Sequence, residues 1–78
     1  MGNIIFDDDG VQVLKDGARF YVKYDAGAHQ VVMREDEISE KDAKRIMVGP
    51  NEATKVLFEL QSRLIQAGID PYVSNIKR

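Results

Sequence analysis

The side chains that could carry out chemistry are few and lie far apart along the chain. His29 is the single histidine, cysteine is absent, and the serines are Ser39, Ser62 and Ser74. A nucleophilic triad needs a hydroxyl or thiol beside a histidine and an orienting acid. The three serines are better explained as a helix cap, a helix surface position and part of a C-terminal segment. We therefore expect no catalytic residue, no cofactor and no enzymatic activity.

Three consecutive aspartates, residues 7–9, suggest a metal site at first sight. A calcium loop of the EF-hand type needs oxygen ligands at alternating positions and a closing glutamate, but Val11 and Val13 occupy ligand positions here. A sheet could bring this turn near Asp25 and His29. Aspartate is also favoured in turns for conformational reasons alone. We expect no metal site.

Four short segments in the first half are rich in β-branched or aromatic residues and have a period of two, which is typical of strands. Their ranges are Ile4–Phe6, Val11–Leu14, Ala18–Tyr24 and Gln30–Arg34. Asp9-Gly10 and Asp16-Gly17 accept the positive φ of a type I′ hairpin turn, and residues 25–28 supply the third turn. These features predict an antiparallel meander.

The second half has the 3.6-residue period of helices. Ser39 is expected to cap a first helix, which Gly49-Pro50 ends. Asn51 is expected to cap a longer helix over residues 52–67. Its buried stripe would consist of Ala53, Val56, Leu57, Leu60, Leu64 and Ala67.

The C-terminal part predicts a helix stop and one further element. Gly68 fits the left-handed position after the last helical turn. Tyr72–Ile76 is either a fifth, edge strand or a loose tail, and we favour the strand. The expected fold is a single α+β domain over residues 1–78, with a four- or five-stranded antiparallel sheet and two helices packed on one face, in the order ββββααβ.

Turn lengths decide which side chains face the helices. A two-residue turn at residues 16–17 pairs Val13 with Phe20, and the next turn pairs Val22 with Val31. One face then carries the apolar residues that the helices must cover. They are Ile4, Phe6, Val11, Val13, Phe20, Val22, Tyr24, Val31 and Met33. A one-residue slip would exchange the two faces.

The opposite face is the candidate binding surface. Its members are Ile5, Leu14, Tyr21 and Val32, with Arg19, Lys23 and Arg34 among them. This register predicts three positive charges and no acid. A solvated face that tolerates some apolar residues explains the pattern equally well. The functional interpretation is contact with an unidentified protein partner or a second copy of the chain, giving a homodimer. Single-stranded nucleic acid is less favoured, because this face offers only one aromatic side chain, Tyr21, on which a base could stack.

A second apolar pair lies on the long helix. Phe58 and Ile65 are seven residues apart and share a helix face. We expect them to pack against the neighbouring helix through Ile46 and Met47. If the short helix packs elsewhere, the pair becomes an exposed contact for a groove.

Composition sets outer limits on function. The chain has a net charge of -2, 44% hydrophobic and 31% charged residues, and no cysteine. The charge balance gives no general attraction to nucleic acid or anionic membrane. Neither a targeting segment nor a membrane-spanning run is apparent, so we expect a soluble cytoplasmic protein. The leading expectation is a small protein-binding or regulatory module without membrane contact.

Overall fold

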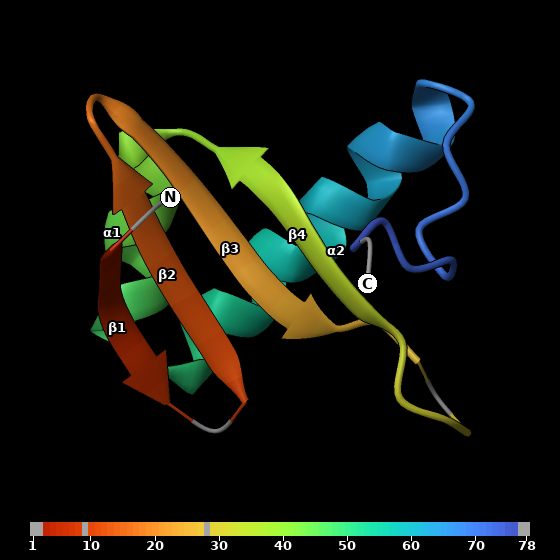
Figure 1. Ribbon diagram of the computed structural model, residues 1–78, viewed down its shortest axis with the longest axis horizontal. Helices are drawn as coiled ribbons and strands as arrows, with labels where there is room; N and C mark the ends of the chain where they lie inside the picture. Colours follow the sequence, from red (N-terminus) through yellow and green to blue (C-terminus); the bar gives the residue numbers. More distant parts are fainter. Residues whose placement is uncertain (1–2, 9, 28, 77–78) are drawn as a thin grey trace.

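The computed structural model describes residues 3–8, 10–27 and 29–76. Four strands form one antiparallel sheet in the order β1-β2-β3-β4, as Figure 1 shows. Their bounds are β1 (Asn3–Asp8), β2 (Val11–Asp16), β3 (Arg19–Asp25) and β4 (Met33–Ile38). The predicted α+β class and four-stranded antiparallel sheet are confirmed.

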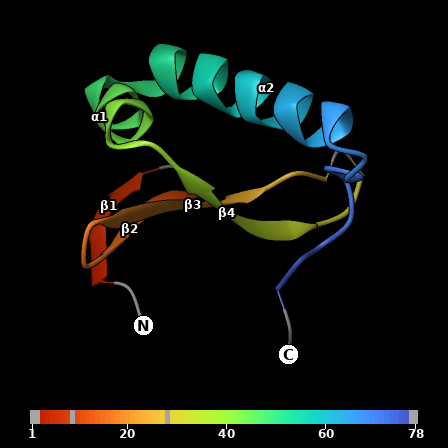
Figure 2. The same cartoon turned by 90° about the horizontal axis from the view of Figure 1, so that it is seen from above.

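Two helices follow the strands. They are α1 (Glu40–Val48) and α2 (Pro50–Gln66). Figure 2 shows both helices on the same side of the sheet. Ser39 caps α1 as predicted, because its hydroxyl accepts the Asp42 backbone N–H at 3.1 Å. Asn51 is not the cap of α2: the helix begins two residues earlier than predicted, at Pro50, with Gly49 as its N-cap. Proline suits a first helical position because the N–H it lacks would have no helical partner.

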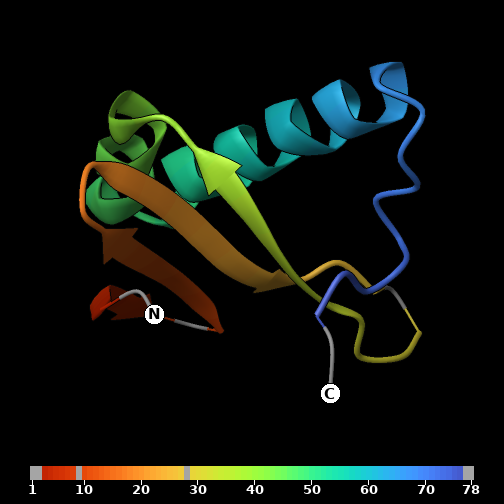
Figure 3. The same ribbon diagram turned by 45° about the horizontal axis from the view of Figure 1, so that its top comes forward.

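The end of α2 has the predicted glycine stop. Gly68 has a φ of 80°, and its N–H donates to the carbonyl of Ile65 at 3.0 Å. The N–H of Ile69 donates to the carbonyl of Leu64 at 2.8 Å. This pair of bonds is a Schellman motif, which satisfies the last helical carbonyls and turns the chain back. Figure 3 shows the chain after α2 returning toward the sheet.

The predicted fifth strand is absent. Tyr72–Ile76 consists of turn, bend and irregular backbone. We call Asp70–Ile76 the C-terminal segment. It lies against β4 through side-chain hydrogen bonds, described below, instead of a backbone ladder.

The core lies between the helices and one face of β2 and β3. Five side chains in it are almost fully buried: Val13, Val22, Tyr24, Ile46 and Val56. The β2–β3 hairpin turns one residue later than predicted, because Asp16 pairs with Arg19 around Gly17 and Ala18. Val13 therefore pairs with Val22 and not with Phe20. The shift moves each pair by two residues, so the inward-facing residues of both strands are as predicted.

The register of β4 was predicted wrongly. Val22 pairs with Asp36, whereas the sequence prediction placed Val31 opposite it, an offset of 36 − 31 = 5 residues. An odd offset inverts the strand, so Arg34 and Asp36 face the helices and Val31 lies outside the sheet with 74% of its surface exposed. Met33 also lies off the core face, opposite Asp25.

Asp25 explains the long connection before β4. Its Oδ1 accepts the backbone N–H groups of Gly27 and Val32, both at 2.9 Å. A further backbone bond of 2.8 Å joins the N–H of Ala26 to the carbonyl of Val32. These bonds hold Val32 beside Asp25 and Ala26, so no tight hairpin joins β3 to β4, and β4 begins only at Met33.

A β-bulge changes the predicted facing of β1. Ile4 pairs with Leu14 and Phe6 with Val13, which leaves Ile5 as the extra residue. Phe6 keeps its inward position, but Ile4 moves to the open face and is 55% exposed. The prediction that Ile4 contributes to the core is therefore wrong. The predicted turn at Asp9-Gly10 includes residue 9, which lies outside the described residues.

Candidate functional site

The open face of the sheet carries two adjacent rows of side chains. The first crosses all four strands through Ile4, Leu14, Tyr21 and Glu37, each paired with the next. It is apolar over β1 and β2, aromatic on β3 and acidic on β4. Leu14 and Tyr21 are half-buried, although no helix covers this face (Figure 2). The row therefore offers apolar surface at the centre of the sheet.

The second row is polar. It runs through Asp7, Gln12, Lys23 and Glu35, again paired in order. The Gln12 amide donates to Oδ2 of Asp7 at 3.1 Å. Opposite charges on neighbouring strands, such as Lys23 and Glu35, favour the pairing. This row borders the apolar one on one side.

The charge of the open face differs from the sequence prediction. Glu35 and Glu37 lie on it, and Arg34 does not. Arg19 faces Asp16 across the hairpin and is not opposite Arg34. Hydrogen bonding with Tyr21 and the negative charge of Glu37 raise the pKa of Arg19. The face is therefore mixed in charge, not basic.

The predicted site residues divide into two groups. Leu14, Arg19, Tyr21 and Lys23 lie together on the open face, and Ile5 sits at the bulge beside them with 43% of its surface exposed. The two predicted members from the fourth segment are elsewhere, because the register of β4 is inverted. Val32 lies in the loop before β4, and Arg34 lies under the helices.

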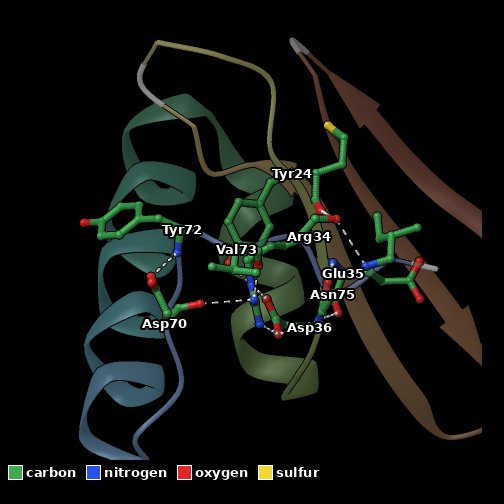
Figure 4. Close-up of polar contacts among 11 residues, drawn as sticks. Tyr24, Arg34, Glu35, Asp36, Asp70, Tyr72, Val73 and Asn75 are labelled. Carbon is green, nitrogen blue, oxygen red and sulfur yellow. Dashed lines mark hydrogen bonds and ion pairs between the residues drawn. The ribbon is translucent and has the colours of Figure 1, made fainter. Parts of the chain in front are cut away.

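Arg34 belongs to a buried polar cluster on the helix-covered face (Figure 4). Its guanidinium binds Asp36 in two places: Nη2 donates to Oδ1 at 2.9 Å and Nε to Oδ2 at 3.1 Å. Tyr24 donates its hydroxyl to the same Oδ2 at 3.0 Å. Arg34 is 4% exposed and Asp36 9% exposed. Such a bidentate pair offsets part of the large cost of removing two charges from water.

The cluster shifts the ionisation of two of its members. Burial, followed by the hydrogen bond to Asp36, raises the pKa of Tyr24 to about 12. The hydrogen bond to Asp36 is also the main cause that raises the pKa of Arg34. Tyr24 is therefore neutral and Arg34 charged throughout the physiological pH range.

The cluster also holds the C-terminal segment. Nη1 of Arg34 donates to the backbone carbonyls of Val73 and, at 3.4 Å, of Asp70. The Ser74 hydroxyl donates to the carbonyl of Met33 at 2.6 Å. A guanidinium has five N–H donors in a fixed plane, so Arg34 can bind a carboxylate and two carbonyls together.

Asn75 makes the most specific contact between the C-terminal segment and β4. Its Nδ2 donates to the carbonyl of Glu35 at 2.7 Å, and its Oδ1 accepts the N–H of Glu35 at 2.9 Å. Nδ2 also lies 3.3 Å from Oδ1 of Asp36. One side-chain amide thus satisfies both outward-facing peptide groups of a strand residue, as Figure 4 shows.

Sequence reasoning missed this cluster for a physical reason. Charged residues are depleted in strands, and the fourth predicted strand, Gln30–Arg34, therefore stops before Glu35, Asp36 and Glu37. The available signal was the spacing of Arg34, Asp36 and Ile38, which places them on one face of a strand. An arginine and an aspartate two residues apart in a strand lie on the same face, so the aspartate can pair with the arginine when both are buried.

The remaining candidates carry little chemistry. His29 is exposed. The Asp25 carboxylate accepts hydrogen bonds from two backbone N–H groups, and these lower its pKa; the larger effect comes from Val32 and the smaller from Gly27. Within residues 3–8, 10–27 and 29–76, no cluster of three acidic or histidine side chains could hold a metal ion. Residue 9, the third aspartate of the N-terminal run, is outside that part of the chain.

A small cavity of about 100 Å³ lies between the start of α2 and the first two strands. Its walls are mostly apolar, and Asp8 and Thr54 provide the polar side chains. The Thr54 hydroxyl donates to the carbonyl of Pro50 at 2.9 Å. Among the residues that the structure describes, the cavity wall therefore holds one carboxylate and one hydroxyl, and the hydroxyl is already hydrogen-bonded within α2.

Phe58 and Ile65 are exposed, at 65% and 58% of their surface. The expectation that they pack against α1 is therefore wrong. Ion pairs also join the two helices: Arg45 binds Glu52 at 3.2 Å and Glu59 at 2.8 Å. An exposed pair of this size is not unusual on a helix surface.

The chain was compared with models of protein families, with curated proteins and with solved structures, and none of the three comparisons found a match. Neither α1 nor α2 is both long and apolar enough to cross a bilayer, and the described residues contain no other helix.

Proposed function

We propose that this protein is a small, non-catalytic protein-binding module that acts through the open face of its sheet. The observation that carries the proposal is the uncovered row of Ile4, Leu14 and Tyr21 beside a row of charged residues. An apolar centre with a polar rim is the usual composition of a protein interface. Tyrosine is also enriched among the residues that dominate binding energy.

The charges favour a protein over single-stranded nucleic acid. Lys23 and Arg19 could contact phosphates, but Glu35 and Glu37 lie directly opposite Lys23 and Tyr21. Carboxylates at these positions would repel a phosphate backbone. A protein partner can present charges of both signs to match them. The proposal places this contact in the cytoplasm, in line with the absence of cysteine.

The test compares two double variants of the tagged chain. Leu14→Ala with Tyr21→Ala removes the centre of the open face, and Phe58→Ala with Ile65→Ala removes the exposed pair on α2. Proteins retained by the wild type from a lysate of cells that make the protein should be lost with the first variant and kept with the second. Circular dichroism melting of both variants checks that each is folded.

Two results would contradict the proposal. One is retention of the same proteins by the open-face variant, and the other is their loss only with the α2 variant. A second copy is the alternative occupant, and light scattering identifies it. A dimer that the open-face variant converts to a monomer of 8.8 kDa would assign the face to self-association.

A further inference from the structure

The contact between Asn75 and Glu35 reproduces the hydrogen bonding of a neighbouring strand. In an antiparallel ladder, two residues of a hydrogen-bonded pair exchange both of their N–H to carbonyl bonds. The Asn75 amide donates to the carbonyl of Glu35 and accepts from its N–H, as such a neighbour would. The outer edge of β4 is therefore a strand-docking edge occupied by a side chain.

Few side chains of the C-terminal segment are buried. Tyr72 and Val73 are 59% and 56% exposed, and Pro71 is the buried residue of the C-terminal segment. The segment has no regular backbone, and its hydrogen bonds with β4 are donated by Arg34, Ser74, Asn75 and the Glu35 backbone N–H. Segments with little buried apolar surface open at low free-energy cost.

The edge also extends beyond the segment. Glu37 is two residues after Glu35, so its peptide groups point to the same outer side of β4. Within residues 3–8, 10–27 and 29–76, no hydrogen bond from outside the sheet reaches the backbone of Glu37. The opposite edge, β1, is less suited to accept a strand because the bulge at Ile5 interrupts it.

We propose that Asp70–Ile76 is a displaceable cap on this edge, and that its competitor is an extended, basic segment of a partner protein. Glu35 and Glu37 project from the edge onto the open face, so an added strand with basic residues at alternate positions would oppose them. A second copy of β4 fits poorly, because antiparallel pairing centred on Glu35 or Asp36 places like charges opposite each other. This inference rests on the proposed protein-binding function and specifies its partner.

The test uses the isotope-labelled protein, with residues 1–78, and the peptide acetyl-Thr-Lys-Val-Lys-Thr-amide as probe. Binding is followed by the amide shifts in NMR spectra. Shifts should concentrate at residues 33–38 and 70–76. The variant Ser74→Ala with Asn75→Ala should bind about tenfold more tightly than the wild type, because the competing cap has lost four hydrogen bonds to β4. Val73→Ala, which keeps the backbone carbonyl that Arg34 binds, is the matched control and should bind like the wild type.

The second part of the test changes the charges of the peptide and of β4. A peptide with glutamate in place of both lysines should not bind, and Glu35→Gln with Glu37→Gln should weaken the lysine peptide several-fold. The proposal is overturned if no peptide binds the Ser74→Ala, Asn75→Ala variant, if that variant binds no more tightly than the wild type, or if the shifts lie away from β4. In those cases the open-face proposal still stands or falls on the Leu14 and Tyr21 variant.

Discussion

Arg34 and Asp36 form a 2.9 Å ion pair beneath the helices, although they are separated by a single residue of the same strand. Their side chains point to the same face because alternate residues of a strand do so. The pair is also bound by Tyr24 and by carbonyls of the C-terminal segment. It therefore links the sheet to the end of the chain, and several measurable properties depend on it.

Removing one partner of this pair should strongly destabilise the fold. Arg34→Ala leaves the Asp36 carboxylate buried without its cation, which typically costs about 3–5 kcal/mol. Arg19→Ala, on the exposed face, is the control and should change the free energy of unfolding by less than about 0.5 kcal/mol. Urea denaturation measures both. Equal, small effects would show that Arg34 is not buried against Asp36.

Tyr24 should make stability fall at alkaline pH. Its pKa is raised from an ordinary value of 10.0 to about 12, so the folded state keeps the phenol neutral where the unfolded chain ionises. The stability it contributes is complete below pH 10.0 and is lost as the pH rises toward 12. The measurement is the midpoint of urea unfolding across this range, compared with Tyr24→Phe. If the wild type and the Tyr24→Phe variant lose the same amount of stability at alkaline pH, Tyr24 is not the cause of that loss.

The two apolar faces of α2 should respond differently to truncation. Leu60 is 3% exposed and Phe58 is 65% exposed. Leu60→Ala should cost about 2–5 kcal/mol, because it removes buried methyl groups and leaves a cavity. Phe58→Ala should change stability by less than about 0.5 kcal/mol. Thermal melting of both variants decides the point, and a large loss for Phe58→Ala would mean that α1 covers it.

Asp25 should make the loop before β4 sensitive to acid. Hydrogen bonds from Val32 and Gly27 lower its pKa, so its contribution to stability is present above 3.8 and is lost as the pH falls through the folded value. Hydrogen exchange at the Val32 amide should become faster in Asp25→Ala at neutral pH. Unchanged exchange at Val32 would contradict the role of Asp25.

The sequence predicted the local elements well. The alternation in β2 and β3 identified their inner faces, and Ser39 and Gly68 marked helix ends that the structure confirms. These features depend on neighbouring residues and on turn chemistry, which are visible in the sequence.

The position of β4 depends on contacts between distant residues. Val31 and Val32 favour a strand by composition, but Asp25 binds the loop and the acidic run after Met33 forms the strand. The Arg34–Asp36 ion pair and the C-terminal segment stabilise that run, and the contacts with the segment have no pattern in the local sequence. Consequently the open-face residues on β2 and β3 were identified, whereas Val32 and Arg34 were misplaced.

Site-specific photo-crosslinking from the open face is the most direct test of the central claim. Benzoylphenylalanine is placed at Tyr21, and in a matched protein at Phe58, which is exposed on α2. After illumination of cells that make each protein, position 21 should give a discrete crosslinked product with another polypeptide, and position 58 should not. No product at position 21, or the same product from both positions, would contradict binding through the open face.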